Sequence, residues 1–98
     1  MKLSEVMNQV DELVKTKGWY SKDSKKSQSP KNLAISISLE ASELLESFQW
    51  SEQGDLASTE EELADVIIYC AQLANVMGIN LEEAVRNKLQ YDFERTWE

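Results

Sequence analysis

The sequence predicts an all-α fold of four helices, and three observations carry that prediction. No segment alternates apolar and polar residues for long enough to favour a β-strand. Four stretches repeat apolar residues at helical spacing, three or four residues apart. The chain has one proline and three glycines, so little interrupts long helices. Its 98 residues fit a single domain, expected to span 1–98 and to bury a modest core.

The first two predicted helices are separated by a polar loop. Apolar residues recur at helical spacing over residues 4–17, which predicts the first helix. Residues 18–29 are expected to form a loop, because after Trp19 and Tyr20 they are small, polar and rich in lysine. Ser29 followed by Pro30 then predicts a helix start, because serine caps a helix N-terminus and proline suits its first position. This second helix is expected to run to about Trp50.

The third and fourth predicted helices follow each other closely. Ser58 and Glu61 form a Ser-x-x-Glu capping box, which predicts the start of the third helix. That helix is expected to end near Met77. Asn80 and Glu83 predict the start of a fourth helix that reaches nearly to the end of the chain. Because the connection is very short, we expect these two helices to pack antiparallel.

The composition restricts the classes of partner. The net charge of −8 argues against binding to a nucleic acid polymer or to an anionic membrane. The start of the chain does not resemble a signal peptide, and no apolar run approaches the roughly 20 residues of a membrane span. Cys70 is the only cysteine, so no intrachain disulfide can form and a reducing, cytoplasmic location is expected.

The absence of histidine restricts the kind of metal site. With no histidine and one cysteine, the chain cannot form an ordinary structural zinc site or the Glu-x-x-His motif of di-iron bundles. Any metal must be held by oxygen ligands, which favour Mg²⁺, Mn²⁺ or Ca²⁺. A structural calcium loop is not predicted, because no 12-residue Asp/Asn-rich stretch with its glycine is present.

Two acidic pairs lie within the otherwise apolar faces of the second and third helices. At about 100° per residue, Glu40 and Glu43 fall among apolar residues of the second helix. Glu62 and Asp65 do the same on the third. The faces expected to point outward are Ser38, Ser42, Gln49 and Glu46 on the second helix, and Glu60, Ala64 and Ala71 on the third. If the two apolar faces pack together, four carboxylates converge.

Such a convergence requires a compensating charge. An ionised carboxylate removed from water costs several kcal/mol unless it is paired or coordinates a metal. Residues 33–77 contain no lysine or arginine, so a divalent cation is the remaining partner. Mg²⁺ commonly meets substrate phosphates in such sites. The alternative is that each acid-x-x-acid pair marks a solvated helix face, but the apolar surroundings of both pairs favour a magnesium–phosphate site.

The residues around these acids resemble those of a known family. The stretch "PKNLAISISLEASELLESFQW", followed by "EELADVIIYCAQLAN", is similar to the MazG-like all-α nucleotide pyrophosphohydrolases, including their dCTP pyrophosphatase branch. The resemblance covers about residues 30–97. The family's pattern of Glu-x-x-Glu, a spacer and Glu-x-x-Asp falls on Glu40, Glu43, Glu62 and Asp65. The resemblance implies a four-helix MazG-like bundle completed by oligomerisation, as a homodimer or a homotetramer.

The resemblance also implies an activity and its residues. It implies hydrolysis of a nucleoside triphosphate to the monophosphate and pyrophosphate, with deoxynucleotides expected and dCTP or modified nucleotides among them. Mg²⁺, with Mn²⁺ as a substitute, would be held by the four acids, and Glu43 is the candidate general base. The residues expected to contact substrate are Lys31, Lys88 and Arg95 at the phosphates, and Trp50 and Tyr69 at the base. Solvated surface charge and ordinary core packing are the alternatives for these residues.

Two departures from the family's pattern concern substrate contacts. Asp92 stands four residues after Lys88, where the family commonly has asparagine or arginine. The loop before Pro30 reads "KDSKKSQS", where the family often carries an aromatic residue. These departures leave a second hypothesis open, a non-catalytic helical protein that binds a nucleotide or a metal. The two hypotheses differ on whether pyrophosphate is released.

Overall fold

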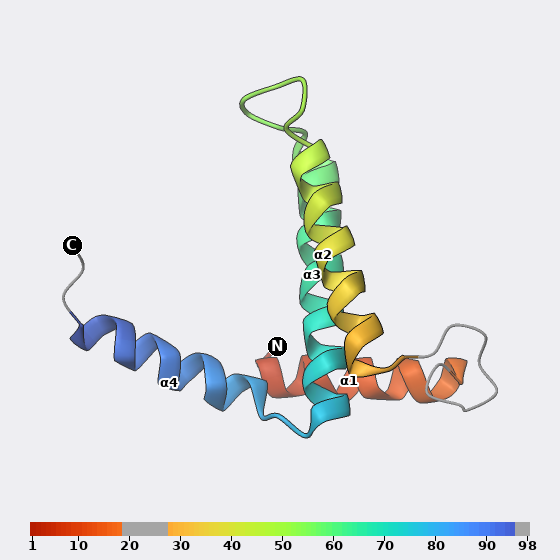
Figure 1. Ribbon diagram of the computed structural model, residues 1–98, viewed down its shortest axis with the longest axis vertical. Coiled ribbons are helices and arrows are strands. Elements are labelled where there is room, and N and C mark those ends of the chain that lie inside the picture. The colour runs from red at the N-terminus through yellow and green to blue at the C-terminus, as the bar shows by residue number, and fades with distance from the viewer. Residues whose placement is uncertain (19–27, 96–98) are drawn as a thin grey trace.

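The computed structural model describes residues 1–18 and 28–95, and these residues form four α-helices and no strand. The helices are α1 (Leu3–Lys17), α2 (Pro30–Glu46), α3 (Leu56–Met77) and α4 (Leu81–Glu94). In Figure 1, α2 and α3 run side by side as an antiparallel hairpin, α1 crosses the base of the hairpin, and α4 leads away from it. The predicted all-α fold class is therefore confirmed.

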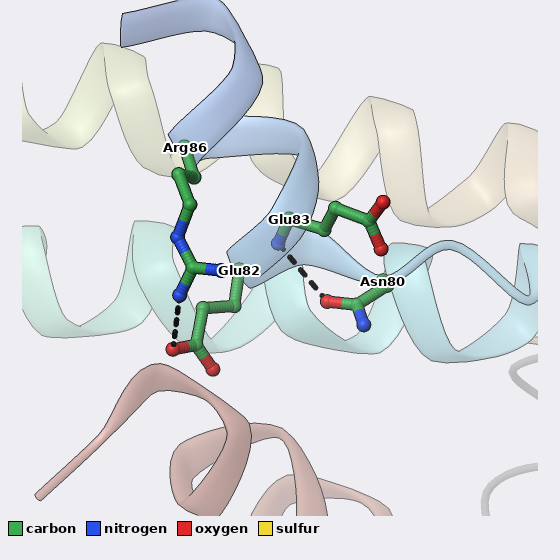
Figure 2. Close-up of polar contacts among 4 residues, drawn as sticks. All are labelled: Asn80, Glu82, Glu83 and Arg86. Carbon is green, nitrogen blue, oxygen red and sulfur yellow. Dashed lines mark hydrogen bonds and ion pairs between the residues drawn. The ribbon is translucent and has the colours of Figure 1, made fainter. Parts of the chain in front are cut away.

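Two of the predicted helix starts are confirmed by their capping bonds. The Ser29 hydroxyl accepts a hydrogen bond from the Asn32 N–H at 3.2 Å, and Pro30 is the first residue of α2. The Asn80 side-chain oxygen accepts from the Glu83 N–H at 3.0 Å (Figure 2). Both bonds satisfy N–H groups that have no partner within the first turn of a helix.

The predicted start of α3 is late by three residues. Asp55, rather than Ser58, is the capping residue, and its carboxylate accepts from the Ser58 N–H at 2.9 Å. Aspartate and serine cap helices about equally well, so position decides between them. Because Asp55 caps α3, Ser58 does not cap it and lies exposed on the surface of the α2–α3 hairpin.

The predicted end of α2 near Trp50 is also wrong, because the helix ends at Glu46. A tight turn over residues 47–50 follows, and the Asp55 N–H donates to the Ser47 carbonyl at 3.2 Å. Gly54 has φ +69°, and a Cβ there would lie 2.6 Å from the Phe48 ring. Because the Phe48 ring packs over Gly54, α2 ends and the chain turns back toward α3 about one helical turn before the position that the apolar pattern predicts.

The main buried cluster lies between α1 and α3. It consists of Met7, Val10, Val14, Ala71 and Ala74. The Asn75 side-chain N–H donates to the Met7 carbonyl at 3.0 Å and ties the two helices together. The expectation that Ala71 faces outward is wrong, because its side chain is 0% exposed. α3 is covered on two sides, by α2 and by α1, and its small residues allow α1 to approach.

The expectation that α3 and α4 pack antiparallel is wrong. The two helices are joined at a bend of 107°. Gly78 ends α3 at φ +69°, and the Ile79 N–H donates back to the Ala74 carbonyl at 2.8 Å. Leu81 then packs against the α1–α3 cluster, so α4 starts out along α1. Within the described residues, no single helix is long and apolar enough to cross a membrane.

The α1–α3 contact predicts different costs for two alanines on one helix. Ala71→Leu should lower the free energy of unfolding by about 1–3 kcal/mol, because the added methyl groups overpack a contact with no room. Ala64→Leu, at an exposed position of α3, is the matched control and should change it by less than about 0.5 kcal/mol. Urea unfolding followed by circular dichroism measures both. Equal costs for the two variants would contradict the packing of α1 on this face of α3.

Candidate metal centre

Three of the four carboxylates predicted to converge come together across the α2–α3 hairpin, and the exposed Glu43 lies outside the group of three. Glu40 and Glu43 lie on α2, and Glu62 and Asp65 on α3. The three-residue spacing places the members of each pair on one face of their helix. One carboxylate oxygen from each of Glu40, Glu62 and Asp65 lies within 4.8 Å of the others. This separation allows the three oxygens to share one cation.

Two oxygens of the cluster are buried without a hydrogen-bond donor. Glu40 Oε2 and Glu62 Oε2 have no hydrogen-bond partner among the described residues. Across residues 1–18 and 28–95 the ion pairs lie within α1 and α4, and none involves an acid of the cluster. A buried carboxylate oxygen without a donor is costly, so the cluster requires a proton or a cation.

The cluster raises the pKa of its own carboxyls. Burial, followed by the neighbouring carboxyls of Glu43 and Glu62, raises the pKa of Glu40 from its ordinary 4.5 to about 7. Burial also raises the pKa of Glu62. In the metal-free protein, protons held by these carboxyls therefore offset part of the negative charge of the cluster. An all-oxygen donor set with excess negative charge fits a hard divalent cation, which would take the place of those protons.

Glu43 borders an open pocket next to the cluster. The pocket has a volume of about 400 Å³ and is lined by Glu43, Glu46, Ser47, Ser58 and Glu62. Glu43 and Glu62 therefore connect the carboxylate cluster to a space of ligand size. Neither Glu46, expected to face outward, nor Ser58, expected only to cap α3, was predicted to line a pocket. The spacing in the sequence indicates that both residues share a helix face with an acid of the site, because Glu46 follows Glu43 by three residues and Ser58 precedes Glu62 by four.

The two aromatic candidates lie in different surroundings. Tyr69 is one turn after Asp65 on α3, and its pKa is raised by burial and then by the charge of Glu40 and of the other acids. Tyr69 is therefore a neighbour of the cluster. Trp50 is 90% exposed on the turn over residues 47–50 and lies outside the cluster. Trp19 and Tyr20, with the lysines that follow them, lie outside the described residues.

The candidate cations are not at the cluster within a single chain. Lys31 is exposed in the first turn of α2, roughly 13 Å before Glu40 along the helix axis. Lys88 and Arg95 lie on α4, which leads away from the hairpin (Figure 1). Both pair with Asp92 of the same helix. Within the described residues, none of these three cations is paired with an acid of the cluster.

Comparison with known proteins places this arrangement in a family. A model of the MazG-like family matches residues 35–96, which include all four acids. The chain belongs to the MazG-like family. Human dCTP pyrophosphatase 1 is 34% identical over 76 residues, and the mouse protein of the same name is 36% identical over 76 residues. The match covers 67% of this chain and 45% of each relative, so the chain spans a little under half the length of those MazG-like relatives.

A solved structure supports the same assignment at the level of the fold. A pyrophosphatase from Archaeoglobus fulgidus superposes on this chain with a TM-score of 0.74 at 38% sequence identity. The superposition covers 91% of this chain and 86% of that one. The fold is therefore shared with that pyrophosphatase over nearly the whole chain.

The raised pKa of Glu40 predicts the pH dependence of stability in the metal-free protein. Since the native state holds the Glu40 proton more tightly than the unfolded chain does, the free energy of unfolding should fall as pH rises from about 4.5 to 7. Glu40→Gln should flatten this dependence and raise the melting temperature at pH 8. Thermal melts with EDTA from pH 5 to 8 measure it, with Glu61→Gln, an exposed acid of α3, as control.

The same melts test the metal. At pH 8, millimolar Mg²⁺ should raise the melting temperature of the wild-type protein and have less effect on Glu40→Gln, because ligand binding to the native state stabilises it. A pH profile of Glu40→Gln that matches the wild type, with no response to metal in either protein, would contradict this account of the cluster.

Proposed function

We propose that this chain is a metal-dependent nucleoside triphosphate pyrophosphohydrolase. The reaction releases the nucleoside monophosphate and pyrophosphate, with deoxynucleotides, dCTP among them, as the expected substrates. The observation that carries the proposal is the carboxylate cluster of Glu40, Glu62 and Asp65, with its buried oxygens that lack donors. Support comes from relatives named as pyrophosphatases, one of which acts on dCTP by its name.

The roles of the acids follow from their positions. Glu40, Glu62 and Asp65 hold Mg²⁺ or Mn²⁺, and Glu43 stands beside them at the edge of the pocket. When bound, the cation supplies positive charge to the phosphate oxygens and lowers the pKa of water. Glu43 accepts the proton of the attacking water as general base. The water attacks the α-phosphorus in line, and the bond from that phosphorus to the bridging oxygen breaks.

We propose that the functional unit is a homodimer or a homotetramer. The chain exposes 7828 Å², whereas a monomeric protein of this mass exposes roughly 5,700 Å². Large apolar side chains lie exposed along the α2–α3 hairpin: Ile35, Leu39, Leu45, Trp50, Leu56, Leu63 and Ile67. The excess area is of the size that a stable interface buries. Residues 1–98 would then act as one domain per copy.

Assembly also supports the remaining substrate contacts. A second copy on the hairpin would supply the phosphate-binding cations that a single chain keeps away from its own cluster. Lys88 and Arg95 on α4, with Lys31 at the start of α2, are our candidates for the phosphates. Trp50 and Tyr69 are our candidates for the base.

The activity is tested with purified protein and Mg²⁺ across the standard dNTPs and NTPs. We expect monophosphate and pyrophosphate in equal amounts, and no product in EDTA. Glu43→Gln should lower kcat by about 10²–10⁴, the usual contribution of a general base, with unchanged circular dichroism. Glu61→Gln, an exposed acid on α3, is the matched control and should retain turnover.

The outcome separates the two hypotheses for this chain. Turnover lost in Glu43→Gln and retained in Glu61→Gln supports the enzyme. Folded wild-type protein that releases no pyrophosphate from any nucleotide would contradict the enzyme and favour a nucleotide-binding or metal-binding protein. Calorimetry with nucleotides would then replace the kinetic measurement.

The assembly is tested by light scattering on wild-type and variant proteins. At tens of micromolar, we expect a mass of at least twice the 11.2 kDa of one chain. Leu63→Glu with Ile67→Glu should shift the protein toward single chains, because two carboxylates would be buried in the interface. Gln9→Glu, at an exposed position of α1, adds charge elsewhere and is the control. A wild-type protein with the mass of one chain would contradict the proposed assembly.

A further inference from the structure

Two cations of α4 converge on a single carboxylate oxygen. Lys88 Nζ lies 2.9 Å from Asp92 Oδ1, and Arg95 Nε lies 3.7 Å from the same atom. Lys88 Nζ is also 4.6 Å from the centre of the Tyr91 ring, and the Arg95 guanidinium is 5.7 Å from it. Lys88, Tyr91 and Asp92 lie on one face of α4, and the side chain of Arg95, the residue that follows the helix, lies against the same carboxylate. The face thus carries an ordered basic pair with a carboxylate between its members.

Stabilisation of α4 does not account for the position of Asp92. Asp92 lies in the last turn, since α4 ends at Glu94, and a carboxylate there faces the negative end of the helix. It also follows Lys88 by four residues, and the opposite order, acid before base, is the more stabilising one.

An ion pair on α1 provides the comparison. Lys15 Nζ lies 2.8 Å from Asp11, the acid comes first, and Lys15 lies in the last turn. The exposure of the two pairs is similar, with the lysine side chains 70% and 62% exposed and the aspartates 34% and 31%. The two pairs therefore differ in which residue comes first, the acid or the base, and in their position along the helix. They also differ in that Asp92 has a second cation nearby, Arg95. Asp11 is placed to stabilise its helix, and Asp92 is placed to neutralise two cations.

We propose that Asp92 is an internal counterion that occupies the place of a phosphate oxygen between Lys88 and Arg95. The inference rests on the proposed function, in which these cations bind a nucleotide's phosphate chain. Carboxylate and phosphate oxygens accept charge-assisted hydrogen bonds of the same kind from ammonium and guanidinium groups. The Tyr91 ring keeps both cations in place while the carboxylate turns away.

The counterion lowers the affinity of the site for anions. Asp92 leaves the basic pair with one net positive charge, and an incoming phosphate chain must displace it and is repelled by it. Asp92→Asn keeps the shape of the side chain and removes both effects. The variant should therefore bind polyphosphate more tightly than the wild-type protein does.

The test is a titration of the metal-free protein with inorganic tripolyphosphate at low ionic strength, followed by NMR. The chain has two arginines, so the Arg95 Nε–H reports on the basic pair. The Arg86 Nε–H, whose side chain pairs with Glu82 at 3.4 Å at the other end of α4, is an internal reference (Figure 2). In Asp92→Asn we expect three-fold to ten-fold tighter binding at Arg95, with little change at Arg86.

Two further variants separate this effect from a general change of charge. Asp11→Asn removes the same charge from the comparable pair on α1 and should bind tripolyphosphate as the wild-type protein does. In a Lys88→Gln background, Asp92→Asn should improve binding less than it does in the wild-type background, because one of the two cations is gone. Equal or weaker binding by Asp92→Asn with unchanged circular dichroism would overturn the proposal. No response of Arg95 in either protein at millimolar probe would also overturn it.

Kinetics distinguish a failure of this inference from a failure of the proposed function. In pyrophosphate release, Asp92→Asn should lower KM by a factor similar to its gain in binding. If Asp92→Asn turns over substrate with unchanged KM and unchanged tripolyphosphate affinity, the counterion role of Asp92 is contradicted and the proposed enzymatic activity is not. If Asp92→Asn binds tripolyphosphate more tightly but neither it nor the wild-type protein turns over a nucleotide, the proposed enzymatic activity is contradicted and the counterion role of Asp92 is not.

Discussion

The structure depends on carboxylates held between two helices with no cation paired to them in residues 1–18 and 28–95. Glu40 on α2 and Glu62 on α3 each bury an oxygen with no donor among the described residues. Their mutual repulsion opposes the packing of the hairpin that carries them. A protein stabilised only by its own packing would replace such acids with apolar residues. The acids therefore act against stability, and in the function proposed above a bound cation offsets that cost.

The rest of the chain supports that hairpin. α1 packs against α3 through Ala71 and Ala74, whose small side chains allow close approach, and Asn75 joins the two helices through the Met7 carbonyl. Leu33, 1% exposed, is the fully buried apolar residue of α2. Much of the remaining apolar surface of α2 and α3 is exposed. The fold thus buries the base of the hairpin and leaves apolar surface on its faces exposed, and this is the surface proposed above to meet a second chain.

Local signals in the sequence predicted the elements and the acids. Ser29, Asn80 and the two acid-x-x-acid pairs depend on residues within one or two turns of each other, so spacing alone reveals them. Contacts between distant residues were not predicted. The burial of Ala71 depends on α1, the end of α2 depends on Phe48 meeting Gly54, and the course of α4 depends on Leu81 packing on α1. A small residue such as Ala71 is predicted to face outward when the helix that packs against it is not known.

The distribution of charge follows from the same constraint. A chain with a net charge of −8 repels a polyphosphate, and its carboxylate cluster repels it most strongly. Lys88 and Arg95 are kept on α4, beside Asp92, rather than next to the acids that would otherwise neutralise them. If those cations paired with Glu40 or Glu62, the cluster would lose both its affinity for a metal and its raised pKa. In the proposed enzyme, this separation of Lys88 and Arg95 from the acids would keep the metal ligands available until the cation and the phosphate chain arrive together.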